Sequence, residues 1–460
     1  MALISLPYLL LTAATAFACR LLPRACRRWV LLAASAVFLC AQGALGCVAA
    51  LAAVLTSYAA ALLIGRLKAK GDARGAKRCT AAAAAALCAF MLVFRGRAQG
   101  ASYLGLILMA YLFDAAKGKT DAQKDPLRLG AFACFYPQMT CGPVSRVQTL
   151  LPQMERAEAS DEGAVLRITW GFFKKLVLAD RLNVLVNAVY ADPGAWSSGT
   201  LWLAVTAYAV AMYADFSGCM DIVLGAAQTL GVRLEENFRR PYFAKSFSEY
   251  WRRWHITMGA WFREYVFYPL ALSPALMKRT ARLSARVKAA WLKRLATAFV
   301  PLMATWALTG LWHGSAWHYV LWGALNGALI LLESCRTPGR KPLPPAAAMG
   351  CTFVVMTLTR VLFRAPSVGA AAAVWRGLFV RQAGYGALAC GLDMADYAVA
   401  LAATAVLALV DALAEKRGLT AARLPGWARF ALSVAGVCAV LIFGMYGPGY
   451  NPAEFYYGRF

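Results

Sequence analysis

The three histidines of this chain are the first candidates for chemistry, because imidazole is the side chain that exchanges protons near neutral pH. His255 lies in the run WRRWHIT, and His313 and His318 lie in LTGLWHGSAWHYVLWG. His313 falls where one apolar stretch ends and the next begins, between Gly310 and Gly314, which permit close backbone approach. A histidine at such a break is either a structural hydrogen bonder or a proton carrier. His318 is interpreted as a polar neighbour.

A second group of candidates lies in the run of residues 213–270, which is dense in charge, aromatic rings and amides. Ionisable groups at membrane depth are costly, so Asp215 and Asp221 are expected to face a cavity, an ion partner or the protein interior. The structural alternative is that both are buried carboxylates that cap helices or pair with arginine. The further supporting candidates are Ser217, Trp312 and Asn326.

Aromatic and basic side chains alternate around His255. They are Trp251, Arg252, Arg253, Trp254, Trp261, Phe262 and Arg263. One interpretation is an amphipathic segment at the cytoplasmic interface, since indole rings and guanidinium stems suit the headgroup layer. The alternative is a cation-lined entrance for an anionic donor, because the guanidinium fork matches phosphate and carboxylate.

The elements that must position these residues are membrane helices. Of 460 residues, 61% are apolar and 15% are charged, with a mean hydropathy of +0.55, which excludes a soluble domain and a disordered chain. The net charge of +26 indicates loops held on the cytoplasmic side, rather than nucleic-acid binding. The 13 cysteines include no CxxC pair, so neither a disulfide framework nor a metal site is expected.

Hydropathy predicts an all-α polytopic protein with 11–12 spans and a single membrane domain over residues 1–460. After an N-terminal span, the apolar stretches lie near 29–43, 47–65, 79–94, 101–116, 168–190, 199–225, 296–312, 315–333, 346–363, 391–413 and 427–447. Several are shorter than the ~20 residues of a perpendicular span, which predicts tilted, re-entrant or interfacial helices. The segment 129–142 is apolar but contains Pro137 and Gly142, so it is expected to bend where protein shields its backbone. Basic clusters place the intervening loops in the cytoplasm and both termini outside.

The run 213–270, followed by GLWHGSAWHYVLWGALNG, strongly resembles the membrane-bound O-acyltransferase (MBOAT) family. The bacterial branch is the most similar, with its alginate and peptidoglycan O-acetyltransferases and the D-alanyl transfer protein of teichoic acid modification. FYPQMTCGPVSR and WGFFKKLVLAD also resemble that branch, so the resemblance covers residues 100–335. It implies a helical protein that moves an acyl group from a cytoplasmic thioester through a central tunnel to a hydroxyl beyond the membrane. His313 then corresponds to the family's catalytic histidine, and His255 to its second, cytoplasmic one.

The residues suit this chemistry independently. A thiolate leaving group, with a pKa near ~8.5, departs without an acid. The attacking alcohol must lose a proton, and a general base with a pKa near the working pH contributes about 10²- to 10⁴-fold in rate. His313 is the predicted base, with Asn326 or Asp215 as candidates to orient its ring. No GxSxG elbow is present. No tightly bound cofactor or metal is expected, and the donor is an acyl-CoA or an acylated carrier protein.

The chain ends in a short aromatic tail at residues 448–460. One interpretation is an aromatic anchor at the outer interface. The bacterial branch, however, closes on a similar motif with a central tyrosine, and the resemblance implies that this tyrosine briefly carries the acyl group. Tyr457 has that place, and Tyr456 precedes it. A phenyl ester is more reactive than an alkyl ester, which suits a relay to an extracellular lipase-like (SGNH-type) acyltransferase.

The predicted function is therefore O-acylation of a cell-envelope or exported polysaccharide in the bacterial cytoplasmic membrane, with acetyl as the favoured group. The alternative within the family is D-alanyl transfer to teichoic acid from an acidic carrier protein, which a basic cytoplasmic face would steer. Alternatives from other classes are a proton-coupled membrane transporter and a non-catalytic scaffold for envelope enzymes. The expected partners are the bilayer, the thioester donor, the extracellular acyltransferase and the polysaccharide, and no nucleic acid.

Overall fold

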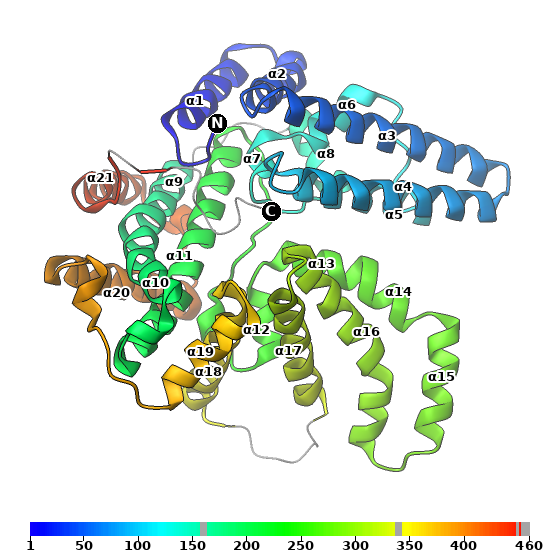
Figure 1. Cartoon of the computed structure of the whole chain (residues 1–460). Coiled ribbons are helices and arrows are strands. Elements are labelled where there is room, and N and C mark those ends of the chain that lie inside the picture. Colours follow the sequence, from blue (N-terminus) through cyan, green and yellow to red (C-terminus); the bar gives the residue numbers. More distant parts are fainter. Residues whose placement is uncertain (157–162, 336–342, 448–449, 452–460) are drawn as a thin grey trace. The chain divides into compact units, whose positions relative to one another are not determined.

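The computed structural model describes residues 1–156, 163–335, 343–447 and 450–451 (Figure 1). Within these ranges the chain is helical and contains no β-strand, apart from two isolated bridges that pair Trp196 with Tyr385 and Phe238 with Trp254. The predicted all-α class is confirmed.

The helices are α1 (Leu6–Leu21), α2 (Arg27–Cys40), α3 (Ala44–Ala69), α4 (Ala73–Phe94), α5 (Ala101–Lys117), α6 (Pro126–Ala133), α7 (Tyr136–Met139), α8 (Val147–Arg156), α9 (Ala164–Phe172), α10 (Asp180–Ala191), α11 (Ser198–Thr229), α12 (Phe247–Arg253), α13 (Ile256–Phe262), α14 (Tyr268–Ala271), α15 (Pro274–Ala285), α16 (Ala290–His313), α17 (Trp317–Ser334), α18 (Pro345–Arg364), α19 (Val368–Phe379), α20 (Met394–Arg417) and α21 (Gly426–Phe443). Two π-helical segments, Phe173–Ala179 and Arg263–Phe267, join α9 to α10 and α13 to α14. Short 3-10 turns lie at Arg24–Cys26, Pro193–Ala195, Pro241–Phe243, Ala387–Cys390 and Ala421–Arg423.

Seven helices of the described part are long and apolar enough to cross a membrane: α3, α4, α11, α16, α18, α20 and α21. Two further apolar helices, α1 and α19, are shorter. The remaining predicted stretches coincide with α2, α5, the α9–α10 region and α17. The chain is therefore a multi-pass membrane protein, and the finer number of 11–12 spans stays a prediction.

The chain divides into two compact units that alternate along the sequence. Unit 1 comprises Met1–Leu176, Asp215–Glu236 and Leu419–Phe460, and unit 2 comprises Val177–Ala214 and Asn237–Gly418. Helix α11 contributes its first half to unit 2 and its second half to unit 1. Because the units interleave, they are not two successive domains, and a single domain over residues 1–460 stays a prediction.

In unit 1, helices α3, α4 and α5 pack side by side (Figure 1). Helix α5 is apolar on nearly all sides and is buried over almost its whole length, as expected of a helix covered on every face. The segment predicted to bend, 129–142, is broken into α6 and α7. All residues of 131–145 are buried, so protein does shield this irregular backbone.

In unit 2, α16 and α17 form a tightly packed helical hairpin (Figure 1). A side-chain carbon at Gly310 of α16 would overlap the carbonyl oxygen of Tyr319, and one at Gly323 of α17 would overlap that of Trp306. The two backbones therefore touch at these glycines, as the sequence predicted for Gly310. This contact brings the end of α16, with His313, against the middle of α17.

Candidate active site

His313 is the last residue of α16, and its ring is enclosed by aromatic side chains. The imidazole centroid lies 4.7 Å from the ring of Trp312, 5.2 Å from Trp322 and 5.0 Å from Phe363. The Trp322 ring is perpendicular to it, at 90°. His313 itself is 4% exposed. These rings, from α16, α17 and α18, form an apolar enclosure around a side chain that can accept a proton.

Trp312 lies near both of the histidines that the sequence identified as candidates, His255 and His313. Its ring centroid lies 6.3 Å from that of His255 and 4.7 Å from that of His313. Both imidazoles therefore lie near one indole, although 58 positions separate them in the sequence (313 − 255). Trp312, predicted as a supporting residue, is the side chain that the structure brings into range of both.

Next to His313, the indole rings of Trp251, Trp306 and Trp322 form a cluster, and Trp251 is one of the predicted residues. Its ring lies 4.7 Å from Trp306 and 5.6 Å from Trp322, both edge to face. Asn326 joins the cluster, because it accepts a hydrogen bond from Trp251 Nε1 at 3.3 Å and donates one to the carbonyl oxygen of Trp322 at 2.8 Å. Asn326 therefore supports Trp322, which contacts His313, and direct orientation of the His313 ring by Asn326 stays a prediction.

His255 lies in the tight connection between α12 and α13, with φ 47° and ψ 52°. This left-handed conformation costs a non-glycine residue of order 1–3 kcal/mol, and such strain clusters at functional sites. Asn237 holds the connection in place. Its carbonyl accepts from Ile256 N at 3.0 Å, and its Oδ1 accepts from Thr257 N at 3.0 Å and from Thr257 Oγ1 at 2.7 Å. Sequence reasoning missed Asn237, since a lone amide in a polar run carries no distinguishing pattern.

Burial lowers the pKa of His255 to about 3. The imidazole is therefore neutral at physiological pH, where it can take part in hydrogen bonds but acts neither as a proton acceptor nor as a cation.

Arg360 of α18 lies next to the His255 connection in an aromatic cage. Its guanidinium carbon is 4.5 Å from the centroid of the Trp254 ring, and it donates hydrogen bonds to the hydroxyls of Tyr242, at 2.9 Å, and Tyr250. The same helix carries Phe363, which contacts His313. Arg360 thus ties the His255 connection to the wall of the His313 enclosure. A charge within the apolar stretch 346–363 was the signal that could have identified it.

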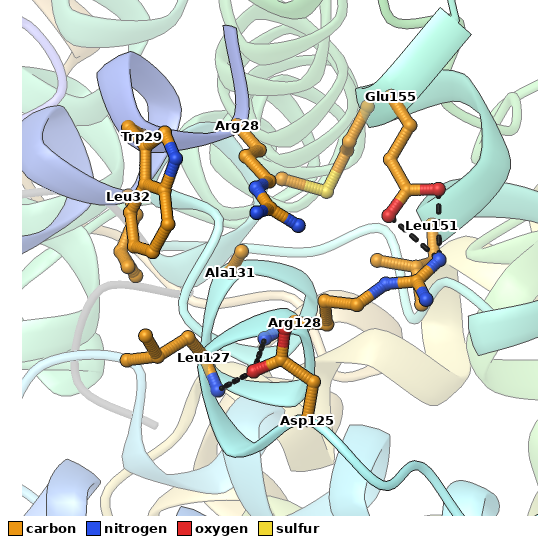
Figure 2. Close-up of a pocket in the computed structure, with 10 residues that line it drawn as sticks. Arg28, Trp29, Leu32, Asp125, Leu127, Arg128, Ala131, Leu151 and Glu155 are labelled. Atoms are coloured by element: carbon orange, nitrogen blue, oxygen red, sulfur yellow. Dashed lines mark hydrogen bonds and ion pairs between the residues drawn. The ribbon is translucent and has the colours of Figure 1, made fainter. Parts of the chain in front are cut away.

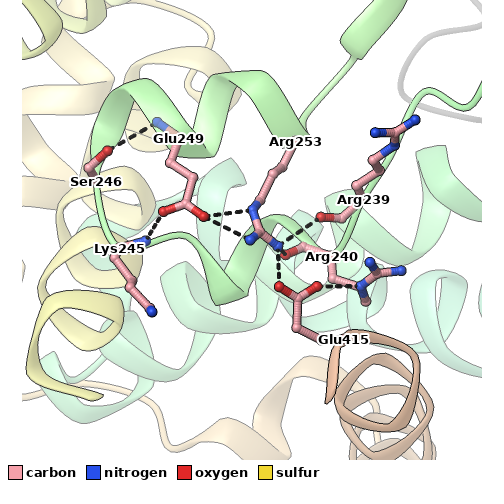
Figure 3. Close-up of polar contacts among 7 residues, drawn as sticks. All are labelled: Arg239, Arg240, Lys245, Ser246, Glu249, Arg253 and Glu415. Carbon is pink, nitrogen blue, oxygen red and sulfur yellow. Dashed lines mark hydrogen bonds and ion pairs between the residues drawn. The ribbon is translucent and has the colours of Figure 1, made fainter. Parts of the chain in front are cut away.

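The basic side chains around His255 differ in their surroundings. Arg253 is held by ion pairs, 2.7 Å to Glu249 and 2.9 Å to Glu415 of α20, and Arg240 joins Glu415 at 2.6 Å (Figure 3). Burial acts to lower the pKa of Arg253, but its hydrogen bonds to the two carboxylates outweigh that effect and raise it. By contrast, Arg252 and Arg263 are exposed.

The interpretation of this segment as an amphipathic surface helix needs correction. Trp254, Trp261 and Phe262 are buried, and Trp251 is half-buried in the indole cluster. Trp251 packs on Trp306, and Trp254 packs on Phe238, both rings from outside the segment. Trp261 packs on the neighbouring Tyr265. The rings are therefore covered by protein instead of lying in a headgroup layer.

The predicted carboxylates lie in unit 1, where each pairs with a cation. Asp215 Oδ1 is 2.7 Å from Lys175 Nζ, and both side chains are 0% exposed. Lys174 Nζ donates to Ser217 Oγ at 2.8 Å and to Asp221 Oδ2 at 2.6 Å. Arg167 Nε also reaches Asp221, at 2.9 Å. The structural alternative, pairing with arginine, describes Asp221, whereas Asp215 pairs with a lysine instead.

Two consecutive lysines of the π-helical segment Phe173–Ala179 contact the same helix. Lys174 and Lys175 both reach α11, at Ser217 and Asp215. Single π-helical turns within helices are frequent at functional sites.

A shallow hollow in unit 1 contains none of the predicted site residues. It is lined by Arg28, Trp29, Leu32, Asp125, Leu127, Arg128, Ala131, Leu151, Met154 and Glu155 (Figure 2). Both of its carboxylates are engaged, since Asp125 accepts from the backbone N–H groups at the start of α6 and Glu155 pairs with Arg128 at 2.7 Å. This hollow offers no proton acceptor comparable to the histidine enclosure.

The remaining predicted site residues have no described contact with the His313 enclosure. Asp215, Ser217 and Asp221 belong to unit 1 and the histidines to unit 2, so a joint role in one tunnel stays a prediction. Tyr456 and Tyr457 lie outside the described residues.

Residues 115–284 match the model of the MBOAT, membrane-bound O-acyltransferase family, which confirms the resemblance inferred from the motifs. Among proteins of known name, the chain is similar to the probable alginate O-acetylase AlgI of Pseudomonas syringae pv. tomato, with 30% identity over 61% of this chain and 51% of that protein. It is also similar to the peptidoglycan O-acetyltransferase of Helicobacter pylori (28%; 54% and 45%) and to the teichoic acid D-alanyltransferase of Bacillus subtilis (26%; 50% and 57%). The chain spans about half the length of these curated relatives.

The buried pair in unit 1 generates a prediction about stability. Lys175→Met leaves Asp215 charged without its partner, which is expected to cost about 3–5 kcal/mol of unfolding free energy. Adding Asp215→Leu removes the stranded charge and should restore much of that loss. The measurement is thermal unfolding of the full chain in detergent, with the exposed Lys70→Met as control. Equal unfolding temperatures for Lys175→Met and Lys70→Met would contradict the pair's role.

The low pKa of His255 predicts how stability depends on pH. The folded pKa of about 3 lies below the unfolded value of ~6.5, so the folded state binds fewer protons between these values. The stability contributed by neutral His255 is present above about pH 6.5 and is lost as the pH falls toward 3. His255→Asn tolerates the same backbone conformation and does not titrate, so the fall in unfolding temperature below pH 6.5 should be smaller in this variant. Superimposable pH profiles would show that His255 is not buried as described.

Proposed function

We propose, because this chain carries a membrane-bound O-acyltransferase domain at residues 115–284, that it transfers an acyl group from a thioester to a hydroxyl for O-acylation of a cell-envelope or exported polysaccharide. The observation that supports this most is the enclosure of His313 by Trp312, Trp322 and Phe363. A proton acceptor in an apolar, water-poor wall suits an acyl transfer in which hydrolysis must be avoided.

In the proposed reaction, the hydroxyl oxygen attacks the acyl carbon of the thioester. His313 takes the hydroxyl proton as the new carbon–oxygen bond forms. The carbon–sulfur bond then breaks, and the thiol leaves as its thiolate. The proton on His313 is afterwards released, either to this thiolate or to solvent, which restores the neutral base.

His255 has a positioning role in this proposal. It is neutral, it is fixed in a strained connection by Asn237, and its ring lies 6.3 Å from the indole of Trp312, which His313 also contacts. We assign to His255 the alignment of Trp312 and of the incoming thioester. We assign to Arg360 the support of the His255 connection and of the α18 side of the His313 enclosure.

The donor is proposed to be an acyl-CoA or an acylated carrier protein, with no tightly bound cofactor. Arg252 and Arg263 are exposed beside the histidine connection and could attract the phosphates of either donor. Arg253 is a weaker candidate for this role, because Glu249 and Glu415 already occupy its guanidinium.

Acetyl is the acyl group that the described surroundings of His313 support best. The ring contacts of His313 are aromatic and apolar, which suits an uncharged acetyl group. A D-alanyl group carries an ammonium, whose desolvation an aromatic wall offsets only in part. D-alanyl transfer to teichoic acid remains the alternative, supported by the similarity to the Bacillus subtilis D-alanyltransferase.

We place the protein in the bacterial cytoplasmic membrane. The proposed partners are an extracellular lipase-like (SGNH-type) acyltransferase and the polysaccharide that accepts the acyl group. Tyr457, or Tyr456 before it, is the proposed relay that carries the acyl group to them.

The base assignment predicts a large and specific loss of activity. In proteoliposomes supplied with acetyl-CoA and a polysaccharide as hydroxyl acceptor, His313→Gln should lower the initial rate of thiol release by about 10²-fold or more. His318→Gln is the matched control, since His318 is also buried and belongs to the adjacent helix. The control should retain most of the rate. A His313→Gln protein as active as this control would overturn the assignment.

The relay and the acyl group are tested by mass spectrometry of the C-terminal peptide after purification at mildly acidic pH. An acetyl adduct on Tyr457 or Tyr456 is expected in the wild type and is expected to be absent in His313→Gln. An alanyl adduct would select the alternative function. An adduct undiminished in the variant would contradict the role of His313.

A further inference from the structure

The region that leads into α16 carries positive charge only. Between Glu264 and Glu333 the sequence contains no acidic residue. The basic residues of this region are Lys278, Arg279, Arg282, Arg286, Lys288, Lys293 and Arg294. Most of them lie on α15 or directly after it, so the charge belongs to one short helix and its junction with α16.

Helix α15 has two distinct faces. It begins at Pro274 after Ser273, whose hydroxyl accepts from Leu276 N at 3.4 Å, and it packs along α16. Leu276, Thr280 and Ser284, spaced by four, are half-buried. This spacing places all three on one side of the helix, the side turned to α16.

The basic side chains occupy the opposite side. Lys278, Arg282 and Arg286 are also spaced by four, and Arg279 lies beside them. All four are exposed, and no carboxylate in the described residues pairs with any of them. Like charges at this spacing repel one another along a helix. Because the protein provides no carboxylate to offset this repulsion in the described residues, an external anionic surface would relieve it.

Apolar side chains and the next helix indicate which anionic surface fits. Met277 and Leu283 are each 51% exposed, on either side of the basic face. Directly after α15 comes α16, which is long and apolar enough to span a membrane and begins with the exposed Trp291. Exposed apolar side chains, basic residues and an indole near the end of a span are the features of a helix at the membrane interface. Because the span α16 follows directly, this face lies next to the bilayer, which favours lipid headgroups over a soluble acidic partner.

We propose that α15 lies at the membrane surface and that Lys278, Arg279, Arg282 and Arg286 bind the phosphates of anionic phospholipids. The four cations form one face long enough to contact more than one headgroup, while Met277 and Leu283 enter the acyl boundary. This proposal does not depend on the acyl-transfer activity, and either can fail without the other.

The test is amide hydrogen exchange of the full chain in nanodiscs of phosphatidylcholine alone, or of phosphatidylcholine with phosphatidylglycerol. Exchange in residues 274–288 should be about tenfold slower or more in the anionic discs, because opening α15 then breaks its headgroup contacts. The difference should shrink in high salt, which screens exposed charges. Neutralising the face with Lys278→Gln, Arg279→Gln, Arg282→Gln and Arg286→Gln together should abolish it.

Two further variants keep the test decisive. Arg66, Lys70, Arg74 and Lys77 are also exposed and lie on the last turn of α3, the connection and the first turns of α4. Neutralising them removes the same charge elsewhere and should leave the difference intact. Exchanging lysine and arginine within the α15 face retains the charge and should also leave it intact. Equal exchange of residues 274–288 in both lipids would overturn the proposal. So would slowing that appears only when an acidic carrier protein is added to phosphatidylcholine discs, which would make α15 a protein-docking helix.

Discussion

The backbone contact between α16 and α17 at Gly310 and Gly323 is the constraint on which the histidine enclosure depends. It removes the space that any side chain would need and so sets His313 against Trp322. The same contact places Asn326 of α17 where it can bind Trp251 of α12. A residue larger than glycine would separate the helices and open the apolar wall to water. The proposed chemistry therefore rests on close packing rather than on an elaborate polar network.

Buried cations hold the surroundings of these elements. Arg360 is surrounded by three aromatic rings and donates hydrogen bonds to two of their hydroxyl groups. These contacts hold α18 against the His255 connection. Lys175 and Asp215 form a fully buried pair in unit 1. Such groups are costly to bury, and their presence alone is weak evidence for stability. Each nevertheless fixes the position of its partner, because a displaced partner would leave a charge uncompensated in an apolar interior.

The sequence predicts the helical class well, because apolar stretches of span length leave few other solutions. It also identifies both histidines, since rare residues in recognisable motifs mark a site. It could not show that Trp312 lies near both imidazoles, because that depends on how α13 and α16 pack. Asn237 could not be identified from the sequence either, because its role depends on the tertiary contact with the connection between α12 and α13. One interpretation placed the aromatic residues of WRRWH at a membrane surface, but Trp254 packs on Phe238 and Trp251 packs on Trp306. Such tertiary contacts are not reported by local amphipathicity.

The most direct test of the central claim is an electron cryomicroscopy structure of the full chain with a hydrolysis-resistant acetyl-CoA analogue. The account predicts density for the acyl carbon within about 4 Å of the His313 ring, the range in which an attacking hydroxyl between them could pass its proton to the imidazole. The acyl chain should lie against Trp312, Trp322 and Phe363. An acyl group bound elsewhere, with the His313 enclosure closed and empty of it, would contradict the assignment of this histidine as the base.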